Sequence, residues 1–150
     1  MLIDGHWLAV SRADPRAFGL YARHYSAVKN ARWRRHGNTN VAGPGEQLVL
    51  LTDSCDALFV WTRNTVDRFD GQHGVNCAVF RNEGSVLSSE LIREADALAW
   101  RRWPAEPRHF TYVDASRVRR KRDPGRCFVR AGWRRCGQSA EGKLLFEVVA

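Results

Sequence analysis

Long hydrophobic runs are absent from this 150-residue chain. No apolar stretch approaches the roughly 18 residues that a helix needs to cross a bilayer. The N-terminal segment, MLIDGHWLAV, has neither the basic start nor the apolar core of a signal peptide. We therefore expect a cytoplasmic protein with no membrane partner.

Cysteine is scarce, with 4 in the chain and no two of them in C-x-x-C spacing. A chain long enough to bury its own core does not need a disulfide framework, and a structural zinc site has no support from this spacing. We predict reduced, mostly buried thiols at Cys55, Cys77, Cys127 and Cys136.

Several catalytic signatures are also missing. The sequence contains no G-x-S-x-G, H-E-x-x-H, Walker A or paired-carboxylate pattern. Four histidines show no metal-ligand spacing: His6, His36, His73 and His109. The sequence therefore gives no support for the hydrolases, zinc peptidases and P-loop enzymes that carry these patterns.

Acidic residues are lacking from two segments of a chain whose net charge is +8. Residues 16–36 hold six basic side chains and no acid, and residues 117–135 hold nine basic side chains and one acid. Residues 46–96 between them hold nine acids and four basic residues. Basic blocks of this kind indicate a polyanion such as nucleic acid or a phosphorylated ligand. The alternative is a basic protein with no nucleic-acid role.

The apolar and turn residues predict a single α/β domain over residues 1–150 with a mixed sheet, because strands and helices alternate and no linker or repeat interrupts them. Helices are expected from Asp14-Pro15, over Ser88–Trp103 with Ser88 or Ser89 as N-cap, and after Pro124-Gly125. A long loop is expected over Asn30–Gly45. Strands are expected at Ile3–Val10, Gln47–Thr52, Ala57–Thr62, Val75–Phe80, Phe110–Val113 and, as a hairpin, near the C-terminus.

The segment from Asp123 to Val148, DPGRCFVRAGWRRCGQSAEGKLLFEV, orders a short helix, a Gly-Trp step and a final hairpin. That order resembles the C-terminal unit of the GNAT (GCN5-related N-acetyltransferase) fold. The resemblance implies a single-domain α/β fold in which a mixed central sheet is splayed around a cofactor cleft.

In GNAT enzymes, a Q/R-x-x-G-x-G/A loop between a strand and a helix holds the pyrophosphate of coenzyme A. Here the loop begins Arg81-Asn82-Glu83-Gly84, and Val86 stands at the final Gly/Ala position. Free N–H groups and the positive end of the helix dipole make such a junction an anion site. The resemblance implies acetyl-CoA or a related acyl-CoA as cofactor, bound by Arg81, Asn82, Gly84, Ser85, Ser88 and Ser89.

Two further positions bear on catalysis. GNAT enzymes often carry a tyrosine acid on the last helix, where this chain has Phe128. The His24-Tyr25-Ser26 step and Asp114 resemble the Mom-type branch of the GNAT-like superfamily. Mom is a phage DNA-modification protein that alters the exocyclic amine of adenine. That resemblance implies a catalytic set of His24, Tyr25, Ser26 and Asp114, in which His24, Tyr25 and Asp114 could hold iron. The alternative is that His24 and Tyr25 end a helix and that Asp114 caps a turn at Ser116.

A base-modifying enzyme must take its target out of the base stack. Arginine binds phosphate bidentately, and tryptophan stacks on an exposed base. The expected nucleic-acid contacts are Arg32, Trp33, Arg34, Arg35, Arg119, Arg120, Lys121 and Arg122. The alternative is that these segments are solvated loops.

Three functions remain open. The first is an acyltransferase-like transferase that acts on an amine of nucleic acid, which the two basic blocks favour. The second is an ordinary GNAT acetyltransferase for a small-molecule or protein amine. The third is a non-catalytic binding module, which Val86 and Phe128 favour over the second.

Overall fold

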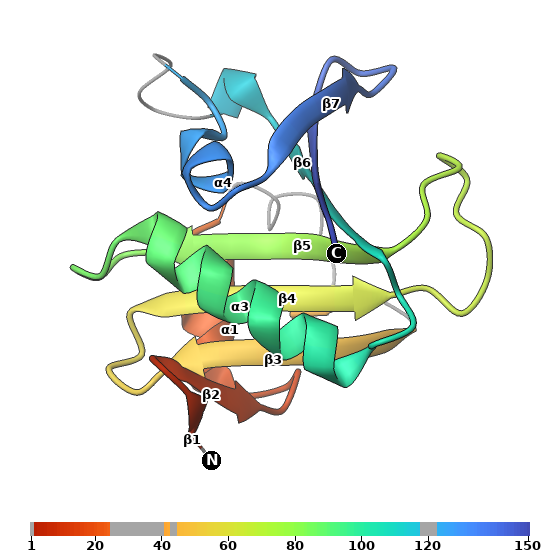
Figure 1. Ribbon diagram of the computed structural model, residues 1–150. Helices are drawn as coiled ribbons and strands as arrows, with labels where there is room; N and C mark the ends of the chain where they lie inside the picture. Colours follow the sequence, from red (N-terminus) through yellow and green to blue (C-terminus); the bar gives the residue numbers. More distant parts are fainter. Residues whose placement is uncertain (1, 25–40, 43–44, 118–122) are drawn as a thin grey trace.

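The computed structural model describes residues 2–24, 41–42, 45–117 and 123–150 (Figure 1). Its helices are α1 (Pro15–Ala22), α3 (Ser88–Arg102) and α4 (Arg126–Arg130), with a 3-10 turn, η2, at Ala115–Arg117. Its strands are β1 (Leu2–Asp4), β2 (Trp7–Val10), β3 (Glu46–Thr52), β4 (Ala57–Arg63), β5 (Val75–Asn82), β6 (Arg108–Val113), β7 (Arg134–Gln138) and β8 (Leu144–Val149).

The expected order of elements is confirmed, with two corrections. The predicted strand Ile3–Val10 is wrong, because Gly5 takes a φ of +61° and turns the chain between β1 and β2. The predicted N-cap of α3 is also wrong. Leu87 occupies that position without a side-chain cap, and the Ser88 hydroxyl instead accepts a hydrogen bond of 3.0 Å from the Asn82 amide.

The eight strands form one mixed sheet in the order β1-β2-β3-β4-β5-β6-β8-β7. All neighbours are antiparallel except β5 and β6, which are parallel because α3 connects them. Helix α3 lies across one face of the sheet and α1 covers the other (Figure 1). None of the described helices is long and apolar enough to span a membrane.

The parallel strands β5 and β6 part soon after they meet, as the resemblance to the GNAT fold implies. They pair only at Val75 with His109 and at Asn76 with Phe110. On their outer sides, β5 stays paired with β4 as far as Asn82, and β6 stays paired with β8 as far as Val113. The sheet is therefore continuous on both sides of an opening between the C-terminal ends of β5 and β6.

A bulge in β5 lies at the start of this opening. Val60 pairs with Val79 and Trp61 with Cys77, so Ala78 is an extra residue on β5. A bulge bends its strand and increases the local twist, and this one lies just after the last pair between β5 and β6. The alternation of apolar and polar residues carries no sign of it.

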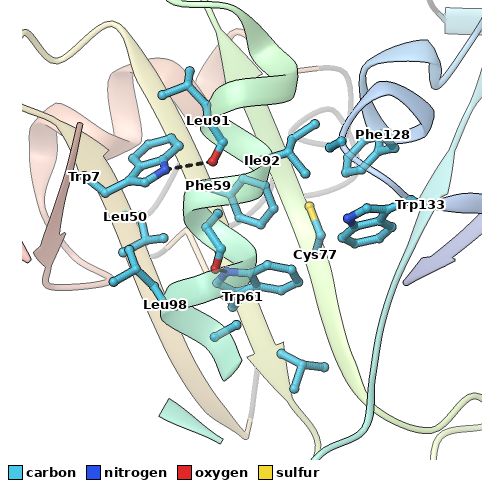
Figure 2. Packing of buried hydrophobic residues seen from close by; sticks show 14 of the residues in the cluster. Trp7, Leu50, Phe59, Trp61, Cys77, Leu91, Ile92, Leu98, Phe128 and Trp133 are labelled. Carbon is cyan, nitrogen blue, oxygen red and sulfur yellow. Dashed lines mark hydrogen bonds between the residues drawn. The ribbon is translucent and has the colours of Figure 1, made fainter. Parts of the chain in front are cut away.

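The core consists of two apolar layers, one on each face of the sheet. In the layer under α3, the indole N–H groups of Trp7 and Trp61 donate to the carbonyls of Leu91 and Ala95, at 3.0 and 3.1 Å (Figure 2). These carbonyls are four residues apart, so they lie one above the other on the same helix face. Two tryptophans from β2 and β4 thus fix α3 against the sheet.

A buried polar group joins α3 to the end of the sheet. The Asp96 carboxylate accepts hydrogen bonds of 2.8 Å from the ring of His109 on β6 and from the indole of Trp133. Burial raises the pKa of Asp96, and the bonds from His109 and Trp133 oppose that rise. His109 is fully buried and stacks on Trp100, and its Nε2 has no partner among the described residues. Asp96 is therefore the hydrogen-bond acceptor that holds the His109 and Trp133 rings in place.

We predict that Asp96→Ala lowers the free energy of unfolding by about 2–4 kcal/mol, because it leaves two buried polar ring groups without a partner. Asp67→Ala, which removes an exposed acid with the same charge, should change it by about 0.5 kcal/mol or less. Urea unfolding of both variants measures the difference. Equal stability of the two would contradict a structural role for this buried network.

Candidate functional site

A cavity of about 190 Å³ lies where β5 and β6 separate. Both strands, the start of α4 and the end of α1 contribute to its wall. The lining residues are His24, Cys77, Ala78, Phe80, Thr111, Tyr112, Val113, Gly125, Cys127 and Phe128. The wall is mainly apolar, so the cavity is suited to a narrow uncharged chain with a few polar contacts.

Two local features shape the cavity. At the next residue pair beyond the last β5–β6 pair, the Thr111 hydroxyl donates to the Cys77 carbonyl at 2.9 Å. A side-chain hydrogen bond thus replaces the backbone hydrogen bonds there. At the opposite wall, Gly125 has a φ of +82°, and a Cβ there would collide with the Phe146 ring. Only glycine lets α4 begin this close to the sheet.

His24 is the basic group in the cavity wall. Burial, and secondarily the positive charge of Arg81, lowers its pKa to about 4. Its backbone N–H donates to the Tyr21 carbonyl at 2.9 Å, which fixes it as the first residue beyond the turn that ends α1. At neutral pH His24 is therefore an uncharged imidazole.

Next to His24, one carboxylate holds two arginines. Glu83 accepts from Arg23 at 2.6 and 2.9 Å and from Arg81 at 2.7 Å. Arg23 and then Arg81 lower the pKa of Glu83 to about 2, so it is ionised at neutral pH. This network connects the end of α1 to the loop that follows β5.

The loop between β5 and α3 is folded by Asn82, whose amide donates to the Val86 carbonyl at 2.7 Å and accepts from the Gly84 N–H at 3.0 Å. A Cβ at Gly84 would collide with the Asp56 carboxylate, so this glycine has a packing reason of its own. Asn82, Gly84 and the Ser88 hydroxyl thus shape the loop from within.

The backbone N–H groups of residues 85–89 take no part in these hydrogen bonds. None of the five donates a hydrogen bond to any group in the described parts of the chain. They run into the N-terminus of α3, where the helix dipole adds partial positive charge. Free amides at a helix start form an anion-binding site.

The remaining predicted residues separate into two groups. Asp114 follows β6 and accepts from the Ser116 N–H at 3.1 Å and from its hydroxyl at 2.6 Å, as expected for a turn cap. Asp114 is not among the cavity residues. Other predicted residues lie outside the described residues: Tyr25, Ser26, Arg32, Trp33, Arg34, Arg35, Arg119, Arg120, Lys121 and Arg122.

The predicted iron ligands gain no support from the described residues. Among the described residues, His24 and Asp114 belong to no group of three metal-ligating side chains. Burial raises the pKa of both cavity thiols, Cys77 and Cys127, which keeps them protonated.

All four cysteines are free, as predicted, but Cys136 is exposed and Cys55 and Cys127 are only half-buried. Phe128 lines the cavity without a proton to donate.

Two solved structures have the same arrangement of elements. An aminoglycoside acetyltransferase, AAC(6')-Ib, in complex with coenzyme A superposes with a TM-score of 0.63 at 12% identity over 96% of this chain and 94% of that chain. A GNAT family acetyltransferase from Listeria monocytogenes superposes with a TM-score of 0.56 at 15% identity over 96% and 95%. This chain has the GNAT acetyltransferase fold. No protein-family model matches it, and no curated protein does. The predicted fold is confirmed, and the Mom-type branch stays a prediction.

We predict that His24 titrates with a midpoint of about 4, and that Arg81→Ala raises this midpoint because it removes a nearby positive charge. Burial remains, so the midpoint stays below 6.5. Between about pH 6.5 and pH 4, His24 is protonated in the unfolded state but not in the folded state. The free energy of unfolding should therefore fall as the pH is lowered through this range. NMR of the imidazole signals measures the midpoint. An unchanged midpoint in Arg81→Ala would show that the charge of Arg81 has no effect on the pKa of His24.

Proposed function

We propose that this protein is an N-acyltransferase that takes an acyl group from coenzyme A and transfers it to an amine. The observation that carries the proposal is the free N–H groups of residues 85–89, a few residues after Phe80, which lines a cavity that opens between parted parallel strands. The amides would hold the pyrophosphate, and the cavity would receive the uncharged arm and its thioester. In AAC(6')-Ib, which has this fold, coenzyme A is bound.

When bound, the cofactor would supply an activated acyl group as a thioester. The acceptor amine would form the new C–N bond, its proton would leave, and the thiol would be released. His24 is the described cavity residue best suited to accept a hydrogen bond from the attacking amine, because it is neutral at working pH. A group with a pKa of about 4 is far too weak a base to deprotonate an alkylammonium ion, whose pKa is about 10.4. The site therefore favours an amine that is already neutral.

We predict that acetyl-CoA binds and that Arg81→Ala weakens binding roughly fivefold, the effect of about 1 kcal/mol for a half-exposed charge contact. Arg102→Ala is the matched control, because it removes the same charge from the opposite end of α3. Isothermal titration calorimetry measures both. An absence of binding heat at millimolar acetyl-CoA would remove coenzyme A as the donor. If acetyl-CoA binds, release of free thiol in the presence of a panel of amines would identify the acceptor class.

A second candidate acceptor is an exocyclic amine of nucleic acid, which is neutral at working pH. The specific observation is that both basic segments contribute to the cavity wall. His24 belongs to residues 16–36, whereas Gly125, Cys127 and Phe128 belong to residues 117–135. A polyanion attracted to these segments would be brought to the cavity.

For this candidate we predict binding of single-stranded or duplex DNA that weakens steeply with salt, because arginine contacts release counterions. Replacing Arg119, Arg120 and Lys121 together with alanine should lower the slope of log K against log salt by about one unit for each phosphate that these side chains bind. Filter binding across a salt series gives the slope. If the slope of the triple variant equals that of the parent, the acceptor is a small molecule or a protein.

A further inference from the structure

A cluster of nitrogen and oxygen ligands lies between the β1–β2 turn and the first turns of α3. His6 comes from the turn, and Glu90 and Glu94 come from successive turns of α3. One ligand atom from each of the three lies within 4.8 Å of the others. In the described part of the chain, no other group of three His, Cys, Asp or Glu side chains meets this condition.

The two carboxylates of this cluster have no arginine or lysine partner among the described residues. Glu83 and Glu147, by contrast, each accept from two arginines. Glu90 and Glu94 are four residues apart on one helix face, where like charges repel. Asp53 and Asp56 add further carboxylates, because both line a second cavity, of about 420 Å³, together with His6. In a protein of net charge +8 this region is acidic, and among the described residues His6 is the one basic side chain that pairs with Glu94.

Two of the three ligands are already held in place. One Glu94 oxygen accepts from the His6 backbone N–H at 2.8 Å, and the other lies 3.0 Å from Nδ1 of the His6 ring. Gly5 makes this approach possible, since a Cβ there would collide with the Glu94 carboxylate. Glu90 is exposed, and its carboxylate makes no hydrogen bond or ion pair with the described residues, so its side chain is free to rotate inward. A site with oriented ligands loses less entropy when it binds an ion.

The ligand chemistry selects the class of ion. An imidazole nitrogen favours zinc and other transition metals over magnesium or calcium, which prefer oxygen ligands alone. Zinc binds histidine nitrogen and carboxylate oxygen at about 2.0–2.2 Å, so tetrahedral ligands lie about 3.4 Å apart. The ligand atoms now lie at most 4.8 Å apart, so a movement of about 1.4 Å would bring them to the tetrahedral spacing, and rotation of the Glu90 side chain can supply it.

We propose that His6, Glu90 and Glu94 bind a zinc ion, with water as the fourth ligand. The ion would neutralise the repelling carboxylates and join the β1–β2 turn to α3. Because β1 pairs only with β2 at the edge of the sheet, this link would hold the N-terminal hairpin. The proposal is independent of the acyltransferase function.

The test is calorimetric titration of the full chain with zinc chloride, beside Glu90→Gln and Glu141→Gln. Both replaced glutamates are exposed, so neither change threatens the fold, and only Glu90 belongs to the cluster. The parent and Glu141→Gln should bind one zinc with equal affinity, and Glu90→Gln should bind at least tenfold more weakly. Zinc should also raise the melting temperature of the parent but not of Glu90→Gln.

Two results would overturn the proposal. One is the absence of binding by the parent chain. The other is undiminished binding by Glu90→Gln, which would place the zinc elsewhere, with the exposed thiol of Cys136 as the alternative ligand. A second variant, His6→Gln, removes the nitrogen ligand and should weaken zinc binding as Glu90→Gln does, because both remove one ligand from the same ion.

Discussion

The whole site depends on the early end of one β ladder. After Asn76 and Phe110, β5 and β6 no longer pair, although β4 and β8 hold their outer edges over their full length. Antiparallel neighbours on both sides prevent the two strands from closing the gap or moving freely. The bond from the Thr111 hydroxyl to the Cys77 carbonyl is a link between the two strands just beyond their last ladder pair, and the bulge at Ala78 follows it directly. An opening in the middle of a sheet is thus a rigid feature of this fold.

A rigid opening also requires that the helices around it be fixed. Tryptophan side chains, whose indole N–H groups donate hydrogen bonds, fix these helices to the sheet. Trp7 and Trp61 donate to carbonyls of α3 from inside the core. Trp133 reaches Asp96 on the same helix and packs on Phe128, which lines the cavity. The position of α4 over the opening is therefore coupled, through Trp133, to a carboxylate buried under α3.

Much of this could be predicted from the sequence because it follows from repetition and order. Apolar periodicity predicted α3, the order of the elements predicted a mixed sheet, and the resemblance to the GNAT fold implied that this sheet is splayed. Single-residue events were not predictable in this way. Gly5 breaks a strand that is continuous in its apolar pattern, the Ala78 bulge leaves no trace in the alternation, and Asn82 draws the Ser88 hydroxyl away from the helix cap. The His6–Glu94 contact joins residues far apart in the chain, so local spacing could not reveal it.

The electrostatics of the loop after β5 separate two sources of anion affinity. The motif suggested that Arg81 attracts a phosphate, but Arg81 and Arg23 share the Glu83 carboxylate, which leaves this group with a net charge of about one positive unit. Asp56 lies directly against Gly84 and opposes an anion there. The N–H groups of residues 85–89 lie at a helix start and donate no hydrogen bond to any of the described residues. Affinity for a diphosphate should therefore come mainly from oriented backbone dipoles, with Arg81 as a lesser contributor. Val86 would contribute its N–H group and not its side chain to such a site, so a valine there would not by itself prevent diphosphate binding.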